Sequence, residues 1–193
     1  MASDLRHMGK NAPPRIKTVR RANLCGIVGG VESEGAMKIS TLLLPTDFSE
    51  CAERAIPYAT WLARIAGSRI ICLHVIEPIV PVVGYAGLVE SVPLADISES
   101  LEESAARELP KLTERDEFAG LEIEEMIVHG EAATEIVRIA KEKRVDLIVI
   151  SSHGRTGLGR ILFGSTAEAV ARHAPCPVLI VKPRAEEPTT DRS

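Results

Sequence analysis

The chain has 193 residues, enough for one domain with short extensions. Apolar residues make up 45% and charged residues 26%, proportions that exclude a disordered, collagen-like or coiled-coil chain. The formal net charge is -4, with six Lys and Arg against three acids in residues 1–36 and seventeen against twenty-four in the rest. An acidic body with few aromatic residues excludes nucleic acid as the main ligand, because phosphate binding needs a basic surface and single strands need stacking platforms.

The cysteines stand at positions 25, 51, 72 and 176, without a C-x-x-C pair or a neighbouring second zinc ligand. We therefore expect free thiols, a cytoplasmic location and no protein-held metal. No stretch reaches the ~18 uninterrupted apolar residues of a membrane-spanning helix, and no membrane partner is expected. Because strong patterning begins only at Met37, residues 1–36 are expected to form a flexible N-terminal extension that lacks the apolar segment of a secretory signal.

Short apolar runs alternate with helical patterns from Met37 onward. Residues 39–44 predict a buried strand, residues 49–66 a helix and residues 69–76 a second strand. Pro57 falls inside the helical pattern, and an interior proline removes a backbone hydrogen bond. A kink or a late helix start is therefore expected there.

The second half of the chain continues the alternation. Its expected elements are a loop at 77–95, a helix at 96–118, a strand at 121–128, a helix marked by Ala133, Ile136, Val137 and Ala140, a strand at 145–150, a glycine-rich loop at 151–164, a helix at 165–174 and a strand at 177–182. This alternation predicts right-handed crossovers and a parallel sheet with helices on both faces. The expected fold is a doubly wound five-stranded α/β domain over residues 37–183, with a disordered tail over 184–193.

Two loops that follow strands are candidates for a binding site, because ligands of open α/β sheets lie beyond the carboxyl ends of the strands. Residues 45–49 (PTDFS) follow the first strand, and residues 151–160 (SSHGRTGLGR) follow the fourth. Glycines in the second loop allow close backbone approach, and Gly164 and Ser165 open a helix with unpaired N–H groups. This loop can therefore hold a phosphate group.

The same residues also have purely structural interpretations. The glycines can form a simple turn, and Ser165 with Glu168 has the spacing of a capping box, which we expect to form. Asp47 can accept hydrogen bonds from a ligand or cap the chain near Ser49. His74 is expected to be a satisfied core or rim histidine.

Known catalytic and nucleotide signatures are absent from these loops. Residues 154–161 read G-x-x-x-x-G-R-I and lack the Lys and Ser/Thr of a P-loop, and the loop after the first strand has none of the glycines of a dinucleotide fingerprint. His153 has no nucleophile and acid partner that spacing can assign to it. We predict no catalytic residues.

The last strand predicts a homodimer. At a sheet edge, its apolar residues would expose unpaired backbone that a second copy could cover across a two-fold axis. The residues of this predicted interface are Val178, Leu179, Ile180 and Val181. The partner protein beyond that second copy is not predicted.

Three motifs resemble the universal stress protein family over residues 38–182: LLPTDFSECAERAIPYA, GEAATEIVRIAKEKRVDLIVISSHGRTGLGRILFGST and HAPCPVLIVK. The nucleotide-binding branch carries G-x2-G-x9-G-[ST], kept here as Ser151-x2-Gly154-x9-Gly164-Ser165 with serine in the first position. The resemblance implies strand order 3-2-1-4-5 and dimerisation through the fifth strand. It also implies an adenine nucleotide (ATP, ADP or AMP), which would bring Mg²⁺ with it.

The resemblance further implies which residues would bind that nucleotide. Asp47 would read the adenine, with help from the backbone of Val75. Pro45 and Thr46 would border the base and ribose, and the ribose and phosphates would be surrounded by Ser151, His153, Gly154, Arg155, Gly164, Ser165 and Thr166. The expected function is a stress-response protein that acts as an ATP-dependent dimeric switch. The alternatives are a nucleotide-free dimeric scaffold and a slow ATP hydrolase.

Overall fold

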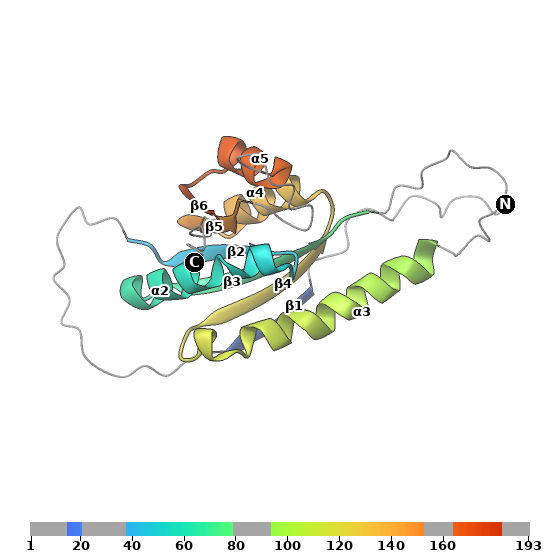
Figure 1. Cartoon of the computed structure of the whole chain (residues 1–193), viewed down its shortest axis with the longest axis horizontal. Helices are drawn as coiled ribbons and strands as arrows, with labels where there is room; N and C mark the ends of the chain where they lie inside the picture. The colour runs from blue at the N-terminus through green and yellow to red at the C-terminus, as the bar shows by residue number, and fades with distance from the viewer. Residues whose placement is uncertain (1–14, 21–37, 79–93, 153–163, 183–193) are drawn as a thin grey trace, which may run out of the picture.

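A computed structural model describes residues 15–20, 38–78, 94–152 and 164–182, with 15–20 and 94–97 described by their backbone (Figure 1). The elements in chain order are β1 (Arg15–Arg20), β2 (Thr41–Thr46), α1 (Glu50–Glu53), α2 (Ile56–Ala66), β3 (Arg69–Ile76), α3 (Leu94–Thr113), the 3-10 turn η1 (Asp116–Phe118), β4 (Ile123–His129), α4 (Ala132–Glu142), β5 (Leu147–Ser151), α5 (Ser165–His173) and β6 (Val178–Val181). Most of the expected loop at 77–95 and the whole expected tail lie outside the described residues.

One sheet runs through the described part of the molecule, in the order β1-β4-β3-β2-β5-β6. The five strands from β2 to β6 pair in parallel, as expected of strands joined by helical crossovers. Counted without β1, their order is 3-2-1-4-5. The expected doubly wound sheet is therefore confirmed.

The extension adds a strand that the sequence did not predict. We expected residues 1–36 to be flexible, but 15–20 form β1, which pairs antiparallel with β4 and shifts register between Ile16 and Val19. Its β-branched residues favour a strand, and the outer edge of β4 offers unpaired backbone groups to satisfy. The expectation was therefore wrong for these six residues; the rest of the extension lies outside the described residues.

Apolar side chains fill both faces of the sheet. Leu42 and Leu43 are neighbours in β2, and both are 0% exposed. Leu42 packs in a cluster with α2 and α3, whereas Leu43 packs in a second cluster with α4 and α5. Figure 1 accordingly shows α4 and α5 together, apart from α2 and α3. A strand covered on both faces explains the continuous apolar runs of the sequence.

The predicted first helix is divided before its proline. α1 ends at Glu53, and α2 begins at Ile56, so that Pro57 falls in the first turn of α2. A first-turn residue has no helical acceptor for its N–H, and proline is tolerated there. The late helix start that Pro57 predicted is confirmed.

Gly67 ends α2 in the left-handed region, at φ 67 and ψ 32. A Cβ added there would have no atom within 4 Å, so a substitution tests the backbone conformation alone. We expect Gly67→Ala to lower the free energy of unfolding by about 1–2 kcal/mol, because an L-residue is strained at this φ. Urea denaturation measures the loss, and Gly67→Asn should cost less since asparagine tolerates this region. An alanine variant as stable as the parent would contradict the prediction.

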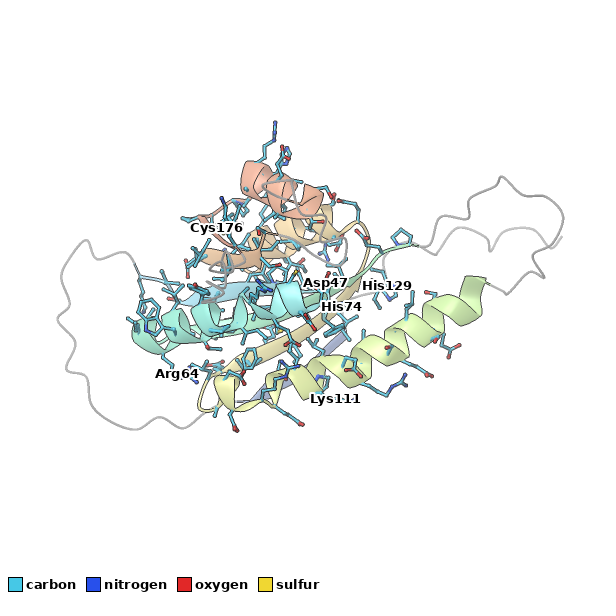
Figure 2. All side chains as sticks on the ribbon, viewed as in Figure 1. Asp47, Arg64, His74, Lys111, His129 and Cys176 are labelled. Atoms are coloured by element: carbon cyan, nitrogen blue, oxygen red, sulfur yellow. The ribbon has the colours of Figure 1, made fainter. Side chains whose placement is uncertain are left out.

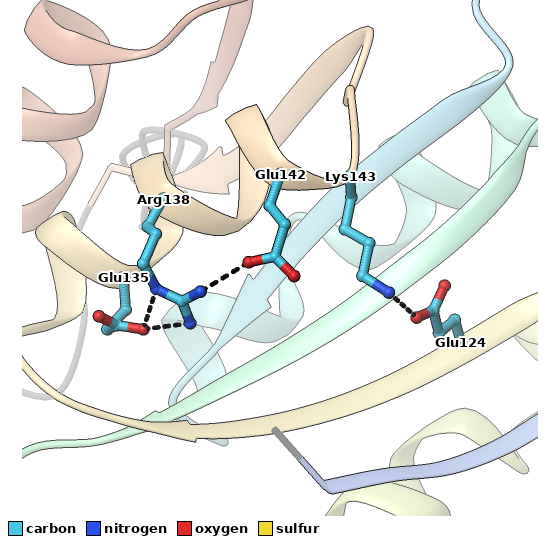
Figure 3. Close-up of polar contacts among 5 residues, drawn as sticks. All are labelled: Glu124, Glu135, Arg138, Glu142 and Lys143. Carbon is cyan, nitrogen blue, oxygen red and sulfur yellow. Dashed lines mark hydrogen bonds and ion pairs between the residues drawn. The ribbon is translucent and has the colours of Figure 1, made fainter. Parts of the chain in front are cut away.

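An ion-pair cluster around the buried carboxylate of Glu124 links β3, β4 and the C-cap of α4. The side chain of Glu124 is 6% exposed; its Oε2 lies 2.9 Å from Arg69 Nη1 and its Oε1 lies 2.8 Å from Lys143 Nζ. Figure 3 shows the bond from Lys143, together with the neighbouring contacts of Arg138 with Glu135 and Glu142 on α4. Both carboxylate oxygens are thus paired with a cation, as a buried charge requires.

The thiols of Cys51, Cys72 and Cys176 are free. Burial, with a smaller contribution from the charge of Glu125, raises the pKa of Cys72 to about 12 and keeps this thiol protonated. None of the described helices is long and apolar enough to span a membrane.

Candidate functional site

A crevice is expected between β2 and β5, the neighbouring strands at which the strand order reverses. After β2 the chain enters α1 and then α2, which packs on one face of the sheet. After β5 it continues to α5, which packs on the other face. The two connections diverge, and both predicted binding loops therefore begin at the same end of the sheet.

The β5 side of the crevice is held by two backbone hydrogen bonds. Ser152 is 0% exposed, and its N–H donates to the carbonyl of Val181 in β6 at 2.8 Å. Its own carbonyl accepts from the N–H of Gly164 at 2.7 Å. The start of α5 is thereby fixed beside the carboxyl end of β5, although eleven residues separate Ser152 from Gly164 in the sequence.

The expected capping box at the start of α5 is wrong. The N-cap is Gly164, Ser165 is the first helical residue, and no side chain among the described residues caps this helix. Glu168 does not reach back to the N-terminus, because its Oε1 pairs with Arg172 Nη2 at 2.9 Å. The bond from Gly164 to Ser152 starts the helix one residue earlier than the capping pattern requires. No side chain of the described ranges therefore uses the first N–H groups of α5, and these groups suit an anion.

The β2 side carries Asp47 in a short hydrogen-bonded turn. Its Oδ1 accepts from the backbone N–H of Ser49 at 3.0 Å and from the Ser49 hydroxyl at 2.6 Å. Ser49 in turn caps α1, its Oγ accepting from the N–H of Ala52 at 3.1 Å. The structural interpretation of Asp47 as a local cap near Ser49 is thus confirmed for one carboxylate oxygen. The ligand interpretation stays a prediction.

Phe48 has a left-handed backbone conformation that the sequence did not predict. Its φ is 61, in the left-handed region that bulky residues rarely adopt. Its ring stacks on that of His74, with centroids 4.4 Å apart and planes inclined by 28°. His74 is buried, as the sequence predicted, and its Nδ1 lies 2.8 Å from the carbonyl oxygen of Thr46. In Figure 2, Asp47 and His74 lie close to each other.

The structure brings most of the predicted site residues to one end of the sheet. Pro45 and Thr46 end β2, Val75 lies near the end of β3, and Ser151 ends β5. Gly164, Ser165 and Thr166 form the start of α5. The predicted residues His153, Gly154 and Arg155 lie outside the described residues.

The serine that replaces the first motif glycine fits its position without backbone strain. Ser151 is buried in β5, pairs with Val181 and is not among the described residues with positive φ. Glycine is required where φ is positive or where a side chain would collide, and the first of these conditions does not hold here. The side chains of the described ranges gather no group of three or more metal-ligating residues.

Residues 38–182 match the model of a family described as the universal stress protein family. The chain belongs to this family. Universal stress protein MJ0531 of Methanocaldococcus jannaschii is 34% identical over 156 residues, which cover 81% of this chain and 89% of that protein. The match excludes residues 15–20, so β1 is an addition to the part of the chain that the universal stress protein family shares.

Solved structures agree with this family and with the fold. The structure described as that of hypothetical protein MJ0577 has a TM-score of 0.65 and 32% identity, covering 77% of this chain and 99% of that one. A universal stress protein in complex with cAMP has a TM-score of 0.57 and 26% identity, covering 75% of this chain and 97% of that one. A member of the universal stress protein family with this fold therefore binds an adenine nucleotide.

Proposed function

We propose that this chain binds an adenine nucleotide between β2 and β5 and acts as a nucleotide-dependent dimeric switch in the stress response. The observation that carries the proposal is the convergence, at the carboxyl ends of neighbouring strands, of Asp47 and the start of α5, which no described side chain caps. A carboxylate suits the amino group of an adenine, and a helix N-terminus suits a phosphate. The cAMP complex of a relative supports the same ligand class.

Each predicted residue would contact the part of the nucleotide that suits its chemistry. On this proposal Asp47 accepts from the adenine amino group, with the backbone of Val75 beside the base and Pro45 and Thr46 bordering base and ribose. Gly164, Ser165 and Thr166 donate N–H and hydroxyl groups to phosphate oxygens, beside Ser151 and the predicted contacts of His153, Gly154 and Arg155. Mg²⁺ would arrive with ATP, coordinated mainly by phosphate oxygens and water.

The proposed second copy pairs through β6. This strand bonds to β5 on one side and ends the described sheet on the other, and Val178, Leu179 and Ile180 are each half-buried. Pairing of two β6 strands would satisfy their outer backbone groups and cover these side chains. Nucleotide binding at the end of the adjacent strand β5 could then change the interface.

The free thiols support a cytoplasmic location.

Calorimetric titration of Mg²⁺-ATP into the full chain tests the proposal, and we expect micromolar binding. We expect Asp47→Asn to weaken ATP binding about 10- to 100-fold, because a hydrogen bond to a charged group is worth about 1.5–3 kcal/mol. Asparagine keeps an oxygen for the Ser49 contacts, so the fold should be unchanged. The variant should also discriminate less between ATP and GTP.

Two outcomes would contradict the switch. A full chain that is purified without nucleotide and gives no heat at millimolar ATP would instead be a dimeric scaffold. Phosphate release that tracks ATP binding and is fast enough to deplete the bound nucleotide would instead indicate a hydrolase. Retention of bound ATP without turnover, with a dimer that changes on binding, is the result expected of the switch.

A further inference from the structure

The turn that carries Asp47 is held in a conformation that its sequence does not favour. Phe48 follows Asp47 directly and has φ 61, where a residue with a Cβ is strained. Other contacts must compensate for this strain if the turn is to persist. Strained backbone that is held in this way is found at ligand clamps and active sites.

Contacts from two strands hold the turn. The N–H of Phe48 donates at 3.1 Å to Oγ1 of Thr46, the last residue of β2. The Phe48 ring stacks on His74, which lies in β3 and pairs in register with Thr46 of β2. His74 Nδ1 contacts the Thr46 carbonyl oxygen at 2.8 Å, and because a carbonyl only accepts, Nδ1 carries the proton. His74 therefore contacts the residues on both sides of Asp47.

We infer that His74, acting through Phe48 and Thr46, is a positioning residue that directs the Asp47 carboxylate toward the base of the nucleotide. The inference rests on the proposed function, and it adds a specificity-determining role for a buried side chain in the neighbouring strand. His74 bonds to the residue before Asp47 and stacks on the residue after it. Asp47 Oδ1 is meanwhile engaged by Ser49, so the direction of the second oxygen depends on this fixed turn.

The physical benefit of this arrangement is preorganisation. A turn that orders itself only when ligand binds must lose conformational freedom at that step, which weakens binding. A turn already fixed by Phe48 and His74 presents its acceptor at no such cost. It also keeps the acceptor in place against a base that carries an oxygen at the same position, because the carboxylate cannot swing away to accommodate that oxygen. The His74 contact should therefore favour adenine over guanine.

Three substitutions in the full chain test separately the ring stack between Phe48 and His74 and the hydrogen bond from His74 to Thr46. His74→Phe keeps an aromatic ring but removes the donor to Thr46, and His74→Asn keeps a donor but removes the ring. Phe48→Gly removes the ring and also relieves the strain at φ 61. We expect each substitution to weaken Mg²⁺-ATP binding by about tenfold, with a smaller loss for Mg²⁺-GTP. The reason is that the turn would no longer be ordered before the nucleotide binds, and ordering it would then reduce the affinity. Phe48→Tyr should retain the stack and the parent affinity.

A double-mutant cycle tests whether His74 acts through Asp47. If it does, adding His74→Asn to Asp47→Asn should cost no further ATP affinity, since the group being positioned has already been changed. Ile136→Val on α4 is the control; this buried residue packs on the opposite face from α2, and its substitution should lower stability without changing the preference for ATP over GTP.

The outcomes also separate this inference from the proposed function. Absence of nucleotide binding by the parent chain would overturn both. Parent binding that His74→Phe and Phe48→Gly leave unchanged in affinity and base preference would overturn the inference alone. Additive losses in the cycle would do the same, because they would show that His74 contributes independently of Asp47.

Discussion

Gly164→Asp is expected to reduce Mg²⁺-ATP affinity by about 100-fold or more while leaving the fold intact or slightly more stable. Gly164 is the N-cap of α5 at φ -70 and ψ 156, a conformation open to any L-residue. Aspartate is a favoured N-cap, so its carboxylate should bond to the first N–H groups of the helix. It would then occupy the proposed phosphate position with a like charge, which costs several kcal/mol against an anionic ligand.

Stability and binding should therefore move in opposite directions in this variant. Calorimetry measures the affinity, and thermal denaturation without nucleotide measures the stability. Gly164→Asn is the matched control: it provides a similar cap without the charge, so the difference in affinity between the two variants isolates electrostatic repulsion. Unchanged ATP affinity in the aspartate variant would place the phosphates elsewhere.

The second large effect concerns the buried carboxylate of Glu124. Arg69→Met together with Lys143→Met should lower the free energy of unfolding by about 3–5 kcal/mol, because both cations that contact a buried charge are lost. Only 6% of the Glu124 side chain is exposed, so water cannot replace them fully. For a chain of this size the loss corresponds to a decrease of roughly 6–20 °C in Tm, measured by differential scanning calorimetry.

A triple variant distinguishes stability lost through an unpaired buried charge from stability lost through poorer packing. Adding Glu124→Met to the double variant removes the unpaired carboxylate and leaves three apolar side chains of similar length. It should recover most of the lost stability, because replacing a whole buried ion cluster with apolar groups is often neutral or stabilising. A triple variant less stable than the double would show that the effect came from packing.

The hydrophobic pattern of the sequence was enough to predict the strands that have apolar side chains packed on both faces. The apolar runs of β2 and β5 predicted strands covered on both faces, and Pro57 predicted a kink or a late helix start, of which the structure has the second. Strand order came from the family resemblance. The predicted site residues of the described ranges lie at one end of the sheet, because strand ends in a parallel sheet share an edge, and their part in binding stays a prediction.

The remaining features depend on contacts between residues distant in sequence. The register of β1 is set by the edge of β4, more than a hundred residues later, and its short charged sequence has no distinctive pattern. The capping box predicted at Ser165 does not form, because the hydrogen bond from Gly164 to Ser152 holds Gly164 at the N-cap position of α5. The left-handed conformation of Phe48 could not be predicted because position 48 is neither glycine nor asparagine; the contacts that hold it come from Thr46 of β2 and His74 of β3.

The position of β1 has a consequence for how copies of the chain can pair. The described sheet has one outer strand from the extension, β1, and another at the opposite side, β6. If two copies join through β6, each brings its own β1 to a far end of the continuous sheet, and no β4 edge is left for a third copy. The outer edges of such a sheet would both be β1 strands, so any further pairing between chains would have to take place through the extension and not through the family's shared strand β4.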